Sequence, residues 1–75
     1  MKELVEIIAK SLVDKPEDVS VTEVSKEDSI ILELRVNPDD MGKVIGKQGR
    51  IAKAIRTVVK AAAIKEEKRV VVEII

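Results

Sequence analysis

The segment from Val44 to Ile51 reads Val-Ile-Gly-Lys-Gln-Gly-Arg-Ile, and its residue types suit the binding of an anion. Two glycines bracket Lys47 and Gln48, between an apolar pair and a stretch with helical periodicity. Glycine has no Cβ, so it adopts left-handed backbone angles and leaves its amides accessible. Amides at the start of a helix carry partial positive charge that favours an anion, and Lys47 and Arg50 add full charges. The pattern predicts a clamp on a phosphate backbone, with the rest of the chain as its scaffold.

Charged residues are unevenly distributed along the 75 residues, although the net charge is zero. Residues 1–40 hold 5 basic and 11 acidic side chains, whereas residues 41–65 hold 7 basic side chains and no acidic one. Such segregation predicts one face that attracts anions. The plainer interpretation, a lysine-rich helix face that is merely solvated, is less favoured because the glycine pair lies in the same segment.

The composition excludes several classes of function. The chain has no cysteine, histidine or aromatic residue, which removes disulfides, thiolate and imidazole metal ligands, and the usual activating base for a nucleophile. We therefore expect no enzyme activity, metal site, cofactor or small-molecule substrate. A P-loop is excluded because only three residues separate Gly42 from Gly46 and Gln48 follows Lys47. No signal pattern and no apolar run of about 20 residues occurs, so a cytoplasmic protein without a membrane partner is expected.

Hydrophobic periodicity predicts an α+β domain over residues 1–75. Helices are expected over 3–13, 37–45 and 50–64, and strands over 19–24, 30–36 and 69–75. Pro16 ends the first helix, and Asn37 caps the second. The alternation of the first strand breaks at Glu23, which indicates a bulge or the strand end. The short turn after that strand predicts an antiparallel hairpin, and the helical crossover before the last strand predicts a mixed three-stranded sheet with three helices on one face.

The last predicted helix separates into two faces. Basic residues Lys53, Arg56 and Lys60 gather on one side, and Ile64 falls among them rather than with the core. The expected core stripe consists of Ile51, Ile55, Val58, Val59 and Ala62.

The segment from Val44 to Ile55 resembles the KH (K homology) nucleic-acid-binding domain, whose pattern is an apolar pair, Gly-x-x-Gly and an apolar residue two positions on. The element order resembles the type II arrangement of that domain, and the stretch from Asp40 to Ile51 is similar to small bacterial proteins with a single KH domain. The resemblance implies an RNA chaperone or adaptor that clamps about four nucleotides of a single strand of small or messenger RNA. It implies an apolar floor made by Val44, Ile45 and Ile51, with part of the second strand as the opposite wall. The expected RNA-binding residues are Lys43, Val44, Ile45, Gly46, Lys47, Gln48, Gly49, Arg50, Ile51 and Lys53.

A groove for about four nucleotides binds weakly, so useful affinity requires a second module. We therefore expect a homodimer, a heterodimer with another RNA-binding protein, or both. The resemblance implies that each is possible, and that the second partner would be a larger RNA-binding protein of the same family. Ile64 is the candidate contact, together with Thr57 and Ala61; the alternative is that Ile64 folds back onto the sheet edge. Two other functions stay open, a single-stranded DNA binder and a dimerising adaptor for a protein partner with a vestigial groove.

Overall fold

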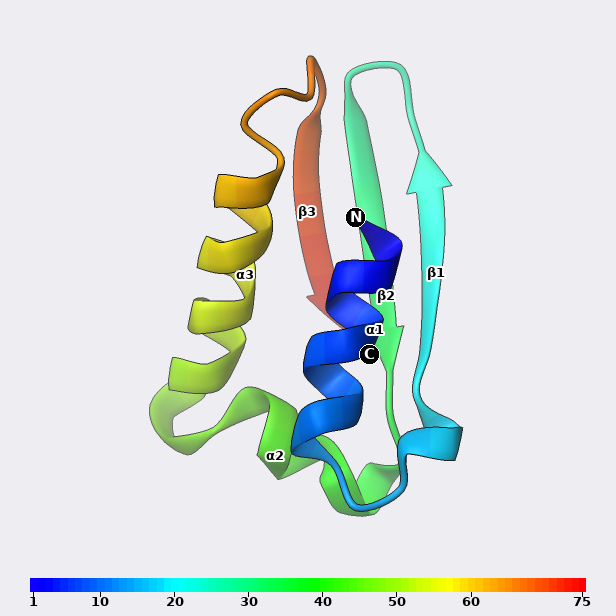
Figure 1. The fold of residues 1–75 in the computed structure, drawn as a ribbon, viewed down its shortest axis with the longest axis vertical. Coiled ribbons are helices and arrows are strands. Elements are labelled where there is room, and N and C mark those ends of the chain that lie inside the picture. Colours follow the sequence, from blue (N-terminus) through cyan, green and yellow to red (C-terminus); the bar gives the residue numbers. More distant parts are fainter.

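Six regular elements follow one another in the predicted order in a computed structural model that describes residues 1–75 (Figure 1). They are α1 (Lys2–Leu12), β1 (Ser20–Ser25), β2 (Ser29–Arg35), α2 (Met41–Ile45), α3 (Arg50–Ala62) and β3 (Arg69–Ile74). Single 3-10 turns precede β1, precede α2 and join α2 to α3. None of the helices combines the length and apolar character needed to cross a membrane.

The sheet has the order β1-β2-β3 and is mixed, as the sequence predicts. β1 and β2 form an antiparallel hairpin with Ser20 opposite Arg35, and β3 lies parallel to β2 with Arg69 beside Ser29. The pairing of β1 is continuous through Glu23, so the broken alternation marks neither a bulge nor the strand end. Because β1 is an edge strand, a charged side chain there stays in contact with solvent.

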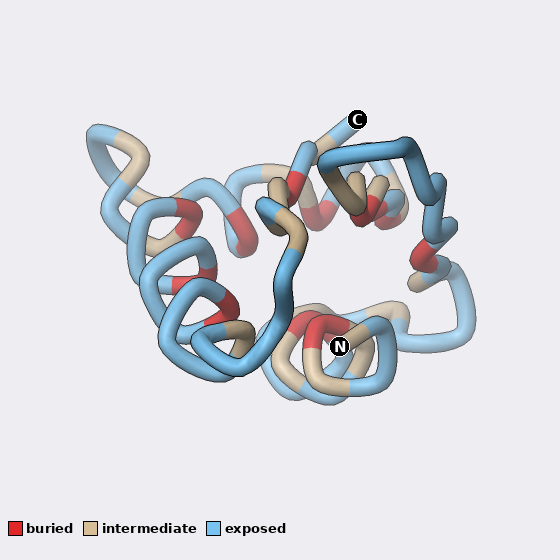
Figure 2. Tube along the Cα trace, turned by 90° about the horizontal axis from the view of Figure 1, so that it is seen from above, coloured by how far each residue is buried: buried red, intermediate tan, exposed pale blue.

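The core lies between one face of the sheet and the helices. Figure 2 shows the buried positions of α1, α3 and the strands turned toward this shared layer. One face of β2 and β3 is aliphatic, and Leu32, Leu34 and Val72 are buried in it. The buried cluster comprises Val5, Ala9, Val21, Leu32, Leu34, Val36, Val44, Ile55, Val59 and Val72.

The predicted core stripe of α3 is partly wrong. Ala52, Ile55 and Val59 are buried, whereas Val58 is 46% exposed and Ala62 is exposed. The helix is therefore rotated, with the Ala52 side turned toward the sheet. The buried width of a helix depends on its neighbours, and α3 packs at the β3 side of a narrow sheet with α1 on only one flank. The helical period in the sequence carries no information about that offset.

Asp40 ties the start of α2 to the end of α1. Its side chain is 2% exposed, and its carboxylate accepts hydrogen bonds from the backbone N–H groups of Asp14 at 3.3 Å and Lys15 at 3.0 Å. The sequence assigns Asp40 only to a helix start, and nothing in its spacing indicates a tie to a loop 25 residues away. The cap predicted for Asn37 is confirmed, because its Oδ1 accepts from the Asp39 N–H at 2.8 Å.

This tie matters because α2 has only 5 residues, too few to be a stable helix on its own. Two anchors hold it in place, the carboxylate of Asp40 at its start and the fully buried side chain of Val44 within it. The loop that follows α2 therefore takes its direction from these two contacts.

Replacing Asp40 by asparagine removes one acceptor oxygen and turns an amide NH2 toward a backbone N–H. We expect Asp40→Asn to lower the free energy of unfolding by about 1–3 kcal/mol, the cost of leaving a buried donor without a partner. Urea denaturation measures this as a lower midpoint with an unchanged m value.

The matched control is Asp39→Asn, which removes a surface ion pair with Lys15 at 3.2 Å. Such a pair contributes no more than about 1 kcal/mol. Equal midpoints for the two variants would contradict a structural role for the buried carboxylate.

Candidate nucleic-acid interface

The connection between α2 and α3 is a tight bend in which three of the four residues have a positive φ. Gly46 has φ 76°, Gln48 has φ 58° and Gly49 has φ 73°. A Cβ on Gly46 would lie 2.5 Å from Cγ1 of Ile51, so only glycine fits there. Around Gly49 there is open space, and glycine is favoured by the positive φ alone. The two glycines are thus required for different reasons, one by space and one by conformation.

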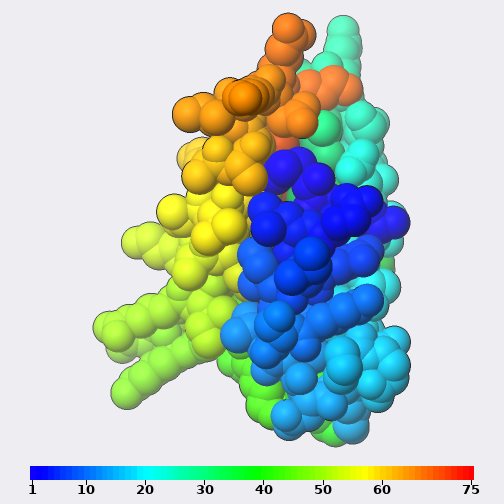
Figure 3. Space-filling model, viewed as in Figure 1, coloured from blue at the N-terminus to red at the C-terminus, as the bar shows by residue number.

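The bend exposes polar groups in front of the first turn of α3. Lys47, Gln48 and Arg50 are exposed, and the Arg50 guanidinium donates to Oε1 of Gln48 at 3.3 Å. Side chains of the loop and the start of α3 protrude from the body of the molecule as yellow-green projections (Figure 3). The start of α3 adds the partial positive charge of a helix N-terminus, although the Arg50 N–H itself donates to the Lys47 carbonyl. The arrangement presents several donors to a ligand without requiring the fold to open.

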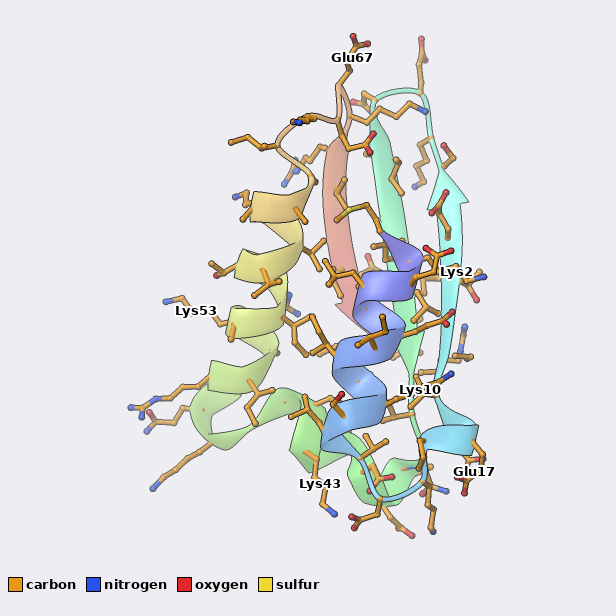
Figure 4. All side chains as sticks on the ribbon, viewed as in Figure 1. Lys2, Lys10, Glu17, Lys43, Lys53 and Glu67 are labelled. Carbon is orange, nitrogen blue, oxygen red and sulfur yellow. The ribbon has the colours of Figure 1, made fainter.

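The positive charges on this side of the molecule are not neutralised. None of the five basic residues from Lys47 to Lys60 forms an ion pair, although the chain as a whole has as many acidic as basic residues. Lys53, Arg56 and Lys60 follow one another along α3 at helical spacing, and Figure 4 shows Lys53 directed away from the protein body. Unpaired cations in a row attract a polyanion better than scattered ones.

A groove of about 330 Å³ lies between α3 and the free edge of β3. Arg56 spans it, since its Nε donates to the carbonyl oxygen of Val72 at 3.4 Å. The groove has a cationic rim and a partly aliphatic lining. Its residues are Arg56, Lys60, Ala63, Lys68, Arg69, Val70, Val71 and Val72.

The structure brings most of the predicted residues together. Those of the loop and the start of α3 share one surface, and Ile45 is 37% exposed beside them. Ile51 is half-buried beneath the loop, against Gly46. The residues of this surface are Ile45, Gly46, Lys47, Gln48, Gly49, Arg50, Ile51 and Lys53.

Two of the predicted residues lie elsewhere. Val44 is 0% exposed and belongs to the core, so it does not form the floor of a binding groove. Lys43 projects toward the α1–β1 loop (Figure 4), where its ammonium pairs with Asp14 and with Asp40 at 3.7 Å. Helical geometry causes both departures, because neighbouring residues of α2 point about 100° apart.

The hydrogen bond that the Lys43 ammonium donates to the Asp14 carboxylate is the main reason that the pKa of Lys43 is raised above its usual 10.5. Any stabilisation from this charge is therefore fully present at neutral pH and is lost only as the pH rises through the raised pKa. Lys43 thus forms part of the scaffold, where its charge pairs with Asp14 and Asp40.

The predicted opposite wall, part of the second strand, stays a prediction. β2 is the central strand, so both of its backbone edges are paired. The strand beside α3 that has a free edge is β3. The sequence analysis missed Lys68 and Arg69 for this reason, because only the strand order places them at the groove. Arg56 and Lys60 could have been included from their helical spacing with Lys53.

The three predicted partner-contact residues lie on the outer side of α3 and just beyond its end. Thr57 and Ala61 are exposed, and the Thr57 hydroxyl donates to the Lys53 carbonyl at 2.9 Å. Ile64 is 82% exposed, so it does not fold back onto the sheet edge. On the other flank of α3, an apolar groove of about 500 Å³ runs along α1. Its lining is Leu4, Ile8, Leu12, Arg50, Ile51, Ala54, Ile55 and Val58.

Comparison with known proteins gives consistent matches. A model of the family described as "KhpA/KhpB, KH domain" matches residues 2–74. The chain is 87% identical over 75 residues to a protein of Clostridium perfringens named RNA-binding protein KhpA, with each chain covered completely. A protein of the same name from Aquifex aeolicus is 53% identical over 75 residues, which are all of this chain and 95% of that one.

A solved structure agrees in fold. The crystal structure of Aquifex aeolicus Era bound to GDP and AlF4⁻ superimposes with a TM-score of 0.70 over 97% of this chain and 28% of the Era chain, at 20% identity. At that identity the match speaks for the fold alone. The observed order, helix-strand-strand-helix-helix-strand with a mixed sheet, is that of a type II KH domain. A KH domain is a binding fold, in agreement with the prediction that the chain is not an enzyme. The chain belongs to the KhpA/KhpB family of KH domains.

Proposed function

We propose that this protein binds single-stranded RNA by clamping its backbone at the loop from Gly46 to Gly49. The observation that carries the proposal is the position of this glycine bend at the start of α3, in a segment whose five basic residues, from Lys47 to Lys60, have no acidic partner. The names of the relatives support RNA as the ligand. KH domains clamp about four nucleotides through this loop.

The geometry suggests which parts of the surface contact the phosphates of the RNA and which contact its bases. Phosphates lie against the loop amides, Lys47 and Gln48, while the following nucleotides run along α3 past Lys53 and Arg56. The bases then face the aliphatic surface of Ile45 and the groove beside β3. No aromatic side chain is present to stack on a base, so base contacts depend on aliphatic packing and on the polar edge of β3.

The number of contacts sets the strength of binding. On a single strand, each neutralised phosphate adds about −0.7 to the slope of the logarithm of the affinity against the logarithm of the salt concentration. We expect two or three such phosphates here. A module of this size binds modestly and with loose sequence preference. We infer a role as an RNA chaperone or adaptor, in which low affinity permits exchange between small or messenger RNAs.

The clamp is tested by the double variant Lys47→Asp with Gln48→Asp, which places two carboxylates where phosphates should lie. We expect no measurable binding of a fluorescent single-stranded RNA oligomer in an anisotropy titration, with the unfolding midpoint unchanged. For the unmodified protein, the affinity should fall with salt at a slope of about −1.4 to −2.1.

The matched control is Lys2→Asp with Ser11→Asp, which makes the same change in charge on exposed positions of α1. It should retain binding. Full affinity in the loop variant would contradict the clamp, and salt-independent binding would favour a protein-interaction adaptor instead. A DNA oligomer of the same sequence, titrated in parallel, separates RNA from single-stranded DNA.

We further propose that two such modules join through the outer face of α3, as a homodimer or as a heterodimer with a KhpB-like RNA-binding protein. Thr57 and Ala61 lie between the cationic row and the apolar groove along α1, and Ile64 is a large apolar side chain left almost fully in solvent. Contact there would bury Ile64 while leaving the glycine loop free. Joining two grooves raises avidity by roughly 10² to 10⁴ without a new RNA contact.

Ile64→Glu tests this surface. We expect sedimentation equilibrium to report a lower average mass at micromolar concentration, because a carboxylate cannot be buried without a partner. Val24→Glu, at an exposed apolar residue on the edge strand β1, is the control and should sediment like the unmodified protein. An unchanged mass for a folded Ile64→Glu protein would remove Ile64 from the interface.

A further inference from the structure

The α1–β1 loop, residues 13–19, is joined by polar contacts to residues 37–43, which lead into α2 and form its first turn. No other two segments of the chain share as many side-chain hydrogen bonds. Neither segment contains a residue of the candidate interface, which begins at Ile45. The contacts can therefore act on that interface only through the position of α2. They join Asp40 to the backbone of Asp14 and Lys15, Lys43 to Asp14, Lys15 to Asp39, and Asn37 to Asp18.

Among these contacts, that of Asp40 differs from the others because its carboxylate is buried. Both carboxylate oxygens accept hydrogen bonds from backbone N–H groups of the α1–β1 loop, one from Asp14 and one from Lys15. The other contacts join exposed side chains, where water and salt weaken an ion pair. Asp40 is therefore the contact that fixes the two segments relative to each other.

The carboxylate of Asp40 does not serve its own helix. Asp40 occupies the N-cap position of α2, where an aspartate commonly accepts hydrogen bonds from the first N–H groups of the helix. Its side chain makes no such bond and binds the α1–β1 loop instead. The geometry therefore indicates a role in placing α2 rather than in starting it.

The position of α2 determines the position of the glycine loop. The path from Asp40 to Gly46 is less than two helical turns, about 9 Å at 1.5 Å per residue. The Gly46 N–H donates to the Gly42 carbonyl at 2.8 Å, so the loop begins on the last turn of α2. Gly46 also lies so close to Ile51 that a Cβ would not fit between them. A shift at the start of α2 therefore has to change the geometry of the bend.

We propose that Asp40 is a positioning residue for the RNA clamp, and that the α1–β1 loop controls the affinity for RNA through it. This inference rests on the proposed RNA clamp and adds a control point outside the interface. Electrostatics alone gives the opposite expectation, because removing a negative charge strengthens the attraction of an anion. The direction of the change in affinity therefore separates positioning from charge.

Asp40→Asn should weaken the binding of a single-stranded RNA oligomer by about fivefold or more, the lower end of the usual coupling between two sites. The salt slope should become less steep by about 0.7, because a displaced loop loses one phosphate contact. Anisotropy titrations at several salt concentrations measure both quantities, at a temperature where circular dichroism shows the variant folded. Asp39→Asn removes the same charge from the neighbouring, exposed residue and should bind RNA at least as tightly as the unmodified protein.

A second control separates positioning from a general loss of stability. Ile30→Ala truncates a half-buried side chain that packs against the core at the hairpin end of β2. It should lower the unfolding midpoint, as Asp40→Asn does, because a core contact is lost. It should nevertheless retain the RNA affinity and the salt slope of the unmodified protein.

Hydrogen exchange on the unmodified protein tests the same coupling without any variant. Coupling between two sites is reciprocal, so a strand bound at the glycine loop also strengthens the contact of Asp40 with the α1–β1 loop. We expect the N–H groups of Asp14 and Lys15 to exchange more slowly in the presence of RNA. The Lys26 N–H, which donates to the Ser29 carbonyl at 2.7 Å in the hairpin, is the control and should exchange at an unchanged rate.

Four outcomes overturn the proposal. Full RNA affinity in Asp40→Asn, with binding lost in the Lys47 and Gln48 double variant, leaves the clamp standing and rejects the positioning role. An equal loss of affinity in Ile30→Ala assigns the effect to stability alone. Unchanged exchange at Asp14 and Lys15 on addition of RNA rejects the coupling, even where Asp40→Asn fails to fold. Absence of RNA binding by the unmodified protein rejects the clamp and the coupling together.

Discussion

The backbone of Gly46 lies directly against the side chain of Ile51, and the rest of the candidate interface depends on this approach. It lets only four residues join α2 to α3, with both helices packed on the same sheet face. A side chain at Gly46 would push α3 away from α2 and would turn the loop amides in a different direction. The tight turn therefore directs the hydrogen-bond donors of the loop toward solvent. The aliphatic core beneath it keeps the turn rigid.

The segregation of charge along the sequence has a structural counterpart. Carboxylates of the first half bind backbone amides and lysines of the scaffold, as Asp40 does with the loop at Asp14 and as Asp39 does with Lys15. The basic residues of α3 find no such partners. A protein of zero net charge can thus present a positive field on one side, because the basic residues from Lys47 to Lys60 form no ion pair with its acidic residues.

Two surfaces of α3 support two different tasks. The cationic row faces the groove beside β3, and the apolar flank faces α1, with Thr57 and Ala61 between them. One helix can in this way offer separate surfaces for the proposed nucleic-acid contact and the proposed protein contact.

The amino-acid sequence by itself determined the order of the elements, the hairpin and the glycine bend. These features are local: periodicity, capping at Asn37 and the conformational freedom of glycine act within a few residues. It also determined the position of most interface residues, because consecutive loop residues must lie together wherever the loop goes.

Only the tertiary structure decided which side of each helix is covered. Val44 became a core residue and Lys43 a partner of Asp14, although both are next to the loop in sequence. Val58 was left exposed, and β3 rather than β2 has the free edge beside α3. The reason is that burial depends on the neighbours that a residue meets in space. Helix rotation, strand order and the reach of Asp40 across the chain are set by packing between distant segments, which no local pattern records.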